Sequence, residues 1–90
     1  MAETRRLIDL YSVGPAIVAD FELLGITRVE QLVGQDADQL YSRLIEITGK
    51  HVDICCADVF KAAIAQAEDP DLPEDRKRWY YWSKVRKQGR

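Results

Sequence analysis

Glycine and proline divide the sequence into short segments whose apolar residues recur with the spacing of an α-helix. The dividing residues are Gly14, Pro15, Gly25, Gly34, Gly49, Pro70 and Pro73. Between them, apolar residues fall three or four positions apart, as in Ile17, Phe21 and Leu24, so they share one face of a helix. No segment shows a convincing strand pattern. The sequence therefore predicts an all-α fold.

We expect a compact domain of five core helices followed by a short C-terminal helical arm. The expected core helices cover about residues 4–12, 15–24, 27–33, 36–48 and 52–67. Thr27 and Glu30 have the spacing of a capping box, and Asp36 is expected to cap the fourth helix. Gly25 and Gly49 are expected to end the second and fourth helices. The residues expected to be buried are Leu10, Val13, Ile17, Phe21, Leu24, Leu32, Leu40, Leu44, Val59, Phe60 and Ile64. Asp58 is expected on the opposite face of the fifth helix.

A length of 90 residues corresponds to one domain, since domains usually hold about 100–200 residues. Within it we expect a helical domain over 1–67, a linker over 68–75 and a basic, aromatic arm over 76–90 that packs on the domain. Trp79 and Trp82 share a helix face, and anchoring on the core is favoured over stacking on bases. If the ring of Trp79 is fully buried, Trp79→Ala should cost about 3–5 kcal/mol.

The net charge of −2 conceals a strong asymmetry. Residues 1–75 hold fifteen acidic and six basic residues, a net charge of −9, whereas residues 76–90 hold seven basic residues and no acid, a net charge of +7. Two interpretations remain open: the arm binds a polyanion, or the acidic body neutralises it.

Residues 8–26 resemble a helix-hairpin-helix motif, with Val13 as its apolar plug, Gly14 as its second glycine and Ala19 as its small residue. This resemblance implies that backbone N–H groups at the hairpin contact a DNA phosphate. The candidate nucleic-acid-binding residues are Ser12, Val13, Gly14, Ala16 and Ile17 in the hairpin and Lys84, Arg86 and Lys87 in the arm. Residues 44–64 resemble a second, degenerate hairpin, and two such units joined by a connecting helix would form the five-helix domain.

The first hairpin departs from the family pattern in two ways. Ser12 replaces the first glycine, which costs about 1 kcal/mol or more if that position needs a positive φ. Ala16 stands where DNA-binding members tend to carry a lysine or arginine, and the acidic residues Asp20 and Glu22 follow in the same helix. The resemblance therefore implies the fold more strongly than the DNA contact.

Residues 5–83 as a whole resemble small bacterial proteins labelled pathogenicity-locus or mitomycin-resistance proteins. The resemblance lies in the connector at 25–32, the helix at 58–64 and the aromatic residues at 79–82. The chain is also similar to the C-terminal domain of bacterial competence regulators. Neither kinship implies an enzyme.

Two functions remain: a non-catalytic module that binds DNA weakly and without sequence preference, or a protein-interaction or self-association module whose hairpin is purely structural. No enzyme, cofactor, metal or small-molecule substrate is expected, because the chain has one histidine and no nucleotide-binding loop. His51 with Cys55 and Cys56 is too few ligands for a zinc site, so we expect reduced, metal-free cysteines. No membrane span or secretion signal is expected, which favours the cytoplasm.

Overall fold

The computed structural model describes residues 5–88, which form four α-helices and three short 3-10 helices without a strand. In chain order these are η1 (Leu7–Asp9), α1 (Pro15–Leu23), η2 (Val29–Leu32), α2 (Ala37–Thr48), α3 (Cys55–Glu68), η3 (Glu74–Lys77) and α4 (Trp79–Gln88). The all-α prediction is confirmed. None of the four α-helices is long and apolar enough to cross a membrane within the described range.

The predicted helix ends around α1 and α2 are confirmed. Pro15 is the first residue of α1, and Gly25 follows its last turn with φ 81°. The N–H of Ile26 donates to the carbonyl of Phe21, and that of Gly25 donates to Glu22, which is the hydrogen-bond pattern of a Schellman motif. The carboxylate of Asp36 accepts the N–H groups of Asp38 and Gln39, and Gly49 ends α2 in the left-handed conformation.

Two of the five predicted core helices are wrong, because those segments form single 3-10 turns. In η1 the carboxylate of Asp9 accepts the N–H of Arg6 at 2.8 Å, which closes one turn; the predicted start at Thr4 lies outside the described residues. At η2 the cap is Gln31 rather than Glu30. Its side-chain oxygen accepts the N–H groups of Thr27 and Arg28 at 2.7 and 2.9 Å.

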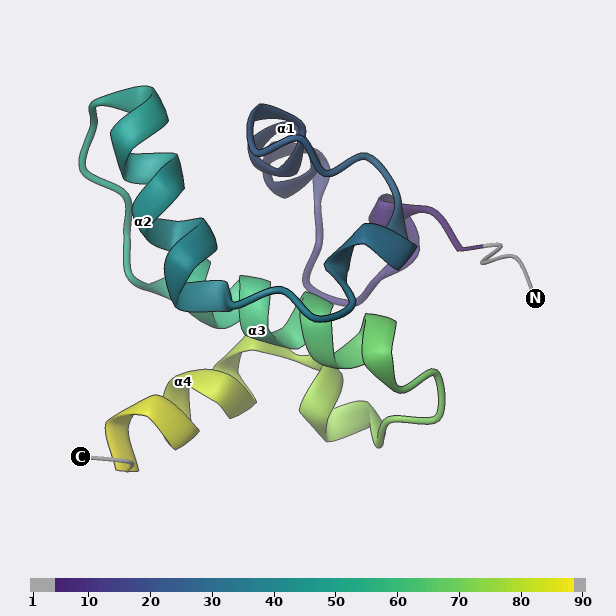
Figure 1. Cartoon of the computed structure of the whole chain (residues 1–90). Coiled ribbons are helices and arrows are strands. Elements are labelled where there is room, and N and C mark those ends of the chain that lie inside the picture. Colours follow the sequence, from purple (N-terminus) through teal and green to yellow (C-terminus); the bar gives the residue numbers. More distant parts are fainter. Residues whose placement is uncertain (1–4, 89–90) are drawn as a thin grey trace.

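The central element is α3, which is buried on both sides. Figure 1 shows α1 and α2 on one side of α3 and α4 on the other. It begins at Cys55, later than the predicted Val52, and ends at Glu68. The prediction that Asp58 lies on an exposed face is wrong, since this residue is fully buried. A helix packed on two sides carries small or apolar residues around most of its circumference, and α3 has alanine at 57, 62, 63, 65 and 67.

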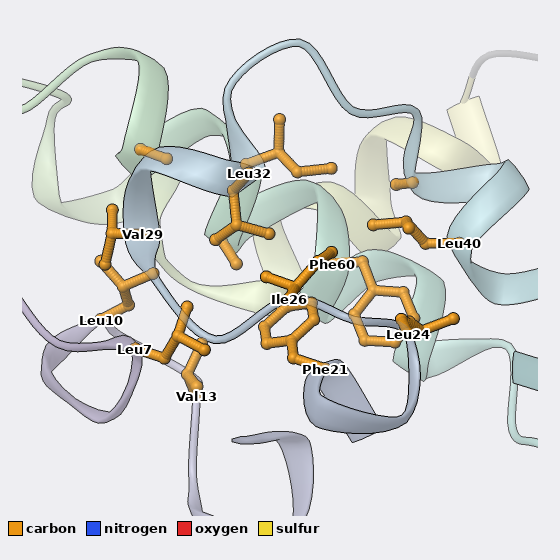
Figure 2. Packing of buried hydrophobic residues seen from close by; sticks show 14 of the residues in the cluster. Leu7, Leu10, Val13, Phe21, Leu24, Ile26, Val29, Leu32, Leu40 and Phe60 are labelled. Carbon is orange, nitrogen blue, oxygen red and sulfur yellow. The ribbon is translucent and has the colours of Figure 1, made fainter. Parts of the chain in front are cut away.

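The hydrophobic core lies between α3 and the chain that precedes it. Figure 2 shows Phe21 and Phe60 in its centre, with ring centroids 5.1 Å apart. Every residue predicted to be buried is buried except Ile17, which is half-buried against the edge of the core. The period of the apolar residues therefore identified the core correctly.

Candidate nucleic-acid interface

The first hairpin, residues 11–14, makes a tight turn into α1. Ser12 has φ 69° and is the one non-glycine residue with a positive φ in residues 5–88. The side chain of Val13 is buried and fixes the turn to the core. Gly14 follows in an extended conformation, with φ −101° and ψ −176°. It is the N-cap residue of α1, and because it has no side chain it makes no side-chain capping hydrogen bond.

The N-terminus of α1 is open. Its first helical hydrogen bond runs from the N–H of Val18 to the carbonyl of Gly14. Within residues 5–88, the N–H groups of Gly14, Ala16 and Ile17 have no hydrogen-bond partner. A Cβ atom added at Gly14 would meet nothing within 4 Å. The helix therefore presents unpaired donors, together with the positive end of its dipole, in open space.

The N-terminus of α3, in the segment predicted to form a second hairpin, lacks this opening. The carboxylate of Asp53 accepts the N–H of Cys55 at 2.9 Å, which occupies the start of α3. This hydrogen bond holds the pKa of Asp53 below its ordinary value. The carboxylate of Asp53 thus occupies the N-terminus of α3. An external anion could be bound by the free N–H groups of α1 but would be repelled by Asp53 at α3.

Two basic side chains lie over an aromatic ring beside the first hairpin. Lys77 Nζ is 5.1 Å from the ring centroid of Tyr11, and the guanidinium carbon of Arg78 is 5.2 Å from it. Arg78 also makes a loose ion pair with Glu74 at 3.8 Å, with both side chains exposed. Tyr11 is three residues before Gly14 in the chain, so these cations flank the hairpin.

Gln66 of α3 holds this arrangement together. Its side-chain oxygen accepts the N–H of Tyr11 at 2.9 Å, and its amide nitrogen donates to the carbonyls of Tyr11 and Lys77 at 3.0 and 3.3 Å. Gln66 is buried, and a buried amide with all these partners costs little to bury. One side chain thereby joins the hairpin to the segment that carries Lys77 and Arg78.

The arm residues predicted from the sequence lie farther from the hairpin. Arg86 makes a bidentate ion pair with the buried carboxylate of Asp58, at 3.0 to 3.3 Å. These hydrogen bonds raise the pKa of Arg86, and its charge is balanced by the buried carboxylate of Asp58. Lys84 and Lys87 are exposed on the same half of α4, roughly 10 Å along the helix from Trp79. The hairpin residues Ser12, Val13, Gly14, Ala16 and Ile17 do lie together.

The ring of Trp79 is not fully buried, the condition under which a loss of about 3–5 kcal/mol was predicted. The side chain of Trp79 is 37% exposed, whereas Trp82 is half-buried and donates its indole N–H to the carbonyl of Arg76 at 2.7 Å. The backbone N–H of Trp79 instead donates to the hydroxyl of Ser12 at 3.0 Å. The antiparallel packing of α4 along α3 selects Trp82 for the inner side.

The cysteines at the start of α3 are free thiols. A hydrogen bond with Asp53 raises the pKa of Cys55, and burial raises that of Cys56. Because the thiolate is the reactive form, both thiols are poor nucleophiles at neutral pH. The described part of the chain holds no cluster of three or more residues suited to a metal ion.

Sequence reasoning missed Tyr11, Lys77 and Arg78. The available signal was the run of three basic residues at 76–78, which begins three residues after Pro73. Nothing in the run itself indicates that Gln66, ten residues earlier, brings it to the first hairpin. The basic charge is thus divided: Arg86 is neutralised by the acidic body, while Lys77 and Arg78 flank the hairpin.

Comparison with known proteins places the chain in a family. The chain is 34% identical over 82 residues to the mitomycin resistance protein McrB of Streptomyces lavendulae. The matched segment covers 90% of this chain and 73% of that protein. No solved structure matches the chain. The family described as "Pathogenicity locus", Cdd1, matches residues 1–88. The chain therefore belongs to the Cdd1 pathogenicity-locus family.

Proposed function

We propose that this protein is a non-catalytic, cytoplasmic module that holds DNA weakly, without sequence preference, through the phosphate backbone. One observation carries the proposal: the unpaired N–H groups at the start of α1 open to solvent beside the cations of Lys77 and Arg78. Such a helix terminus favours a phosphate through its donors and its dipole. Contacts to phosphate fix position on the duplex and read no bases.

In this proposal the chain is a tandem of two helix-hairpin-helix units, joined by η2, of which only the first binds. The first comprises η1 and α1, and the second comprises α2 and α3. Asp53 satisfies the N–H of Cys55 in the second unit and would repel a phosphate there. The second unit then has a structural role, because it supplies Gln66 and the core of the domain.

The cations of the proposed interface are Lys77 and Arg78, in place of the three arm residues that the sequence suggested. Arg86 is held by Asp58, and Lys84 and Lys87 lie roughly 10 Å along α4 from Trp79, the residue whose N–H is bound to Ser12 of the hairpin. Asp20 and Glu22 on α1 oppose DNA binding, so the affinity is low. We expect a dissociation constant of about 10–100 μM, within the usual range for non-specific binding.

Salt dependence separates the two sets of cations. Neutralisation of two phosphates by Lys77 and Arg78 gives a slope of log K against log salt of about −1.8, from 0.9 per contact. Anisotropy titrations of a labelled duplex should show a slope near zero for the double variant Lys77→Gln/Arg78→Gln. The variant Lys84→Gln/Lys87→Gln removes the same charge and should keep most of the slope. The reverse ranking would return the interface to the C-terminal half of α4.

A substitution at Gly14 tests the backbone donors without a change of charge. Serine at this position can accept the N–H of Ala16 or Ile17, as capping residues do, and its side chain meets open space. Gly14→Ser is therefore expected to raise helix stability by a few tenths of a kcal/mol while it weakens DNA binding at an unchanged salt slope. Unchanged affinity in a folded Gly14→Ser protein would exclude the hairpin from the interface.

A protein-interaction or self-association role is the second candidate, favoured by a depression of about 220 Å³ between α2, α3 and α4. Trp82 and Lys61 line it together with the carboxylates of Asp36, Asp38 and Glu68. The occupant would be a partner protein or a second copy of the chain. Failure to bind DNA even at about 10 mM salt, where screening is weakest, together with a concentration-dependent sedimentation coefficient, would favour this function.

A further inference from the structure

Three aromatic side chains are exposed in residues 5–88, and all belong to the surface beside the first hairpin. They are Tyr11, Trp79 and Tyr80, with exposed fractions of 38%, 37% and 51%. The other five aromatic residues are buried or half-buried. The rings of Trp79 and Tyr80 leave flat apolar surface in water, whereas the ring of Tyr11 carries the cations of Lys77 and Arg78.

The rings of Trp79 and Tyr80 are in contact, and the backbone of Trp79 is bound to Ser12, next to Tyr11; we call Tyr11, Trp79 and Tyr80 the aromatic platform. The rings of Trp79 and Tyr80 meet edge to face, with centroids 6.2 Å apart. Trp79 is fixed to Ser12, the neighbour of Tyr11, by the hydrogen bond from its N–H at 3.0 Å. Tyr11 lies under the cations of Lys77 and Arg78. Two positive charges at Tyr11 and the ring pair of Trp79 and Tyr80 therefore lie close to the same turn.

This combination identifies the chemistry of a ligand. Positive side chains attract a polyanion, and exposed rings offer stacking to flat, unpaired bases; proteins that hold single strands use both features together. In a duplex each base is already stacked on its neighbours and presents only its edges. A surface built from rings and cations has more to gain from unpaired bases than from a duplex.

We propose that the aromatic platform stacks unpaired bases, so that the nucleic acid held at the first hairpin is single-stranded DNA or an unpaired segment within DNA. This inference rests on the proposed function, since the phosphate contacts at α1 and Lys77 and Arg78 hold the strand. The bases beside the held phosphates then lie over Trp79 and Tyr80. Stacking of this kind tolerates any base, because every base has a π-face.

The test compares a labelled twelve-residue thymidine oligonucleotide with a twelve-base-pair duplex in anisotropy titrations at low salt. Wild-type protein should bind the single strand more tightly. Trp79→Ala should weaken single-strand binding about tenfold, the loss expected for one stacked base, and leave duplex binding unchanged. Trp79→Phe should retain most of the affinity because it keeps a ring. Ile47→Ala, which removes another exposed apolar side chain, from α2, should change neither affinity.

A second readout needs no substitution. The indole N–H signal of Trp79 in the wild-type protein should shift on addition of the oligonucleotide, while that of Trp82, which is hydrogen-bonded to Arg76, should not.

Two results would overturn the inference while the proposed function stands: equal affinity for both forms with no effect of Trp79→Ala, or equal losses for both forms. Loss of duplex and single-strand binding alike in Lys77→Gln/Arg78→Gln would still support the hairpin interface. Binding of neither form by wild-type protein would overturn both proposals and leave the aromatic platform as a protein-binding surface.

Discussion

The hydroxyl oxygen of Ser12 accepts a hydrogen bond at 3.0 Å from the backbone N–H of Trp79, 67 residues later in the sequence. Ser12 holds the left-handed conformation that the hairpin pattern normally assigns to glycine. A non-glycine residue there stores strain of about 1 kcal/mol. The serine side chain offsets that strain because it joins the hairpin to the first turn of α4. The departure from glycine therefore has a structural reason.

Substitutions at Ser12 separate the strain from the hydrogen bond. Ser12→Ala keeps the strain and loses the bond, so we expect a loss of about 1 kcal/mol in the free energy of unfolding. Ser12→Gly loses the same bond but removes the strain, and the two effects should nearly cancel. Urea denaturation measures both. Equal stability of the alanine and glycine variants would contradict the account of strain at this position.

The ion pair between Arg86 and Asp58 should respond unequally to loss of either partner. Asp58 is fully buried, while the side chain of Arg86 is 29% exposed. Arg86→Ala leaves a buried carboxylate unpaired, a situation that costs about 3–5 kcal/mol when water is fully excluded and somewhat less here. Asp58→Ala leaves a guanidinium that can turn to water. Chemical denaturation should show the larger loss for Arg86→Ala; the opposite order would contradict this assignment.

Because of this ion pair, truncation of the arm is expected to destabilise the fold as well as remove positive charge. Deletion of residues 84–90 removes the charges of Lys84, Lys87 and Arg90. The deletion also removes Arg86, so the buried carboxylate of Asp58 loses its ion-pair partner. We now expect the truncated protein to unfold at a lower urea concentration than the full chain. For this reason the paired glutamine variants, rather than truncation, are the suitable test of charge.

The two tryptophans should differ in their contribution to stability. Trp79 is exposed, so Trp79→Ala is expected to cost less than about 1 kcal/mol, as surface substitutions usually do. Trp82 is half-buried and hydrogen-bonded, and Trp82→Ala is expected to cost about 2–3 kcal/mol, below the range for a fully buried ring. Thermal denaturation ranks them. A larger loss for Trp79→Ala would restore the anchoring role predicted from the sequence.

Asp53 gives a pH dependence with a defined sign. Its pKa is lowered in the folded protein by the hydrogen bond from the N–H of Cys55. The stabilisation is therefore fully present above the unfolded pKa, about 3.9, and is lost as the pH falls through the lower folded value. Asp53→Ala should be less stable than wild type at pH 7, and the two curves should converge in strong acid. A difference in the free energy of unfolding between the two proteins that stays constant down to pH 2 would argue against this role of Asp53.

Local signals in the sequence predicted a large part of this structure. Asp36, Gly25 and Gly49 mark helix ends through their own side chains or φ angles, and helical spacing located Phe21 and Phe60 in the core. These features depend on residues a few positions apart. They can therefore be predicted without knowledge of the tertiary structure.

The features that sequence reasoning missed depend on which elements pack together. Asp58 and Gln66 are buried because α4 and the hairpin cover a second face of α3, and polar residues at those positions resemble a solvated face until their partners are known. The position of Lys77 and Arg78 follows from Gln66. For the same reason the sequence favoured Trp79 and the C-terminal half of the arm.

The position of the nucleic acid on the surface is measured most directly by amide chemical shifts of ¹⁵N-labelled protein during titration with DNA at low salt. The account predicts the largest changes at Gly14, Ala16 and Ile17, with further changes at Lys77 and Arg78. The amides of Cys55 and Cys56 serve as an internal control, because the corresponding terminus of α3 is capped by Asp53. Changes confined to the depression at Asp36 and Trp82, or no change at about 1 mM DNA, well above the usual range of non-specific dissociation constants, would contradict it.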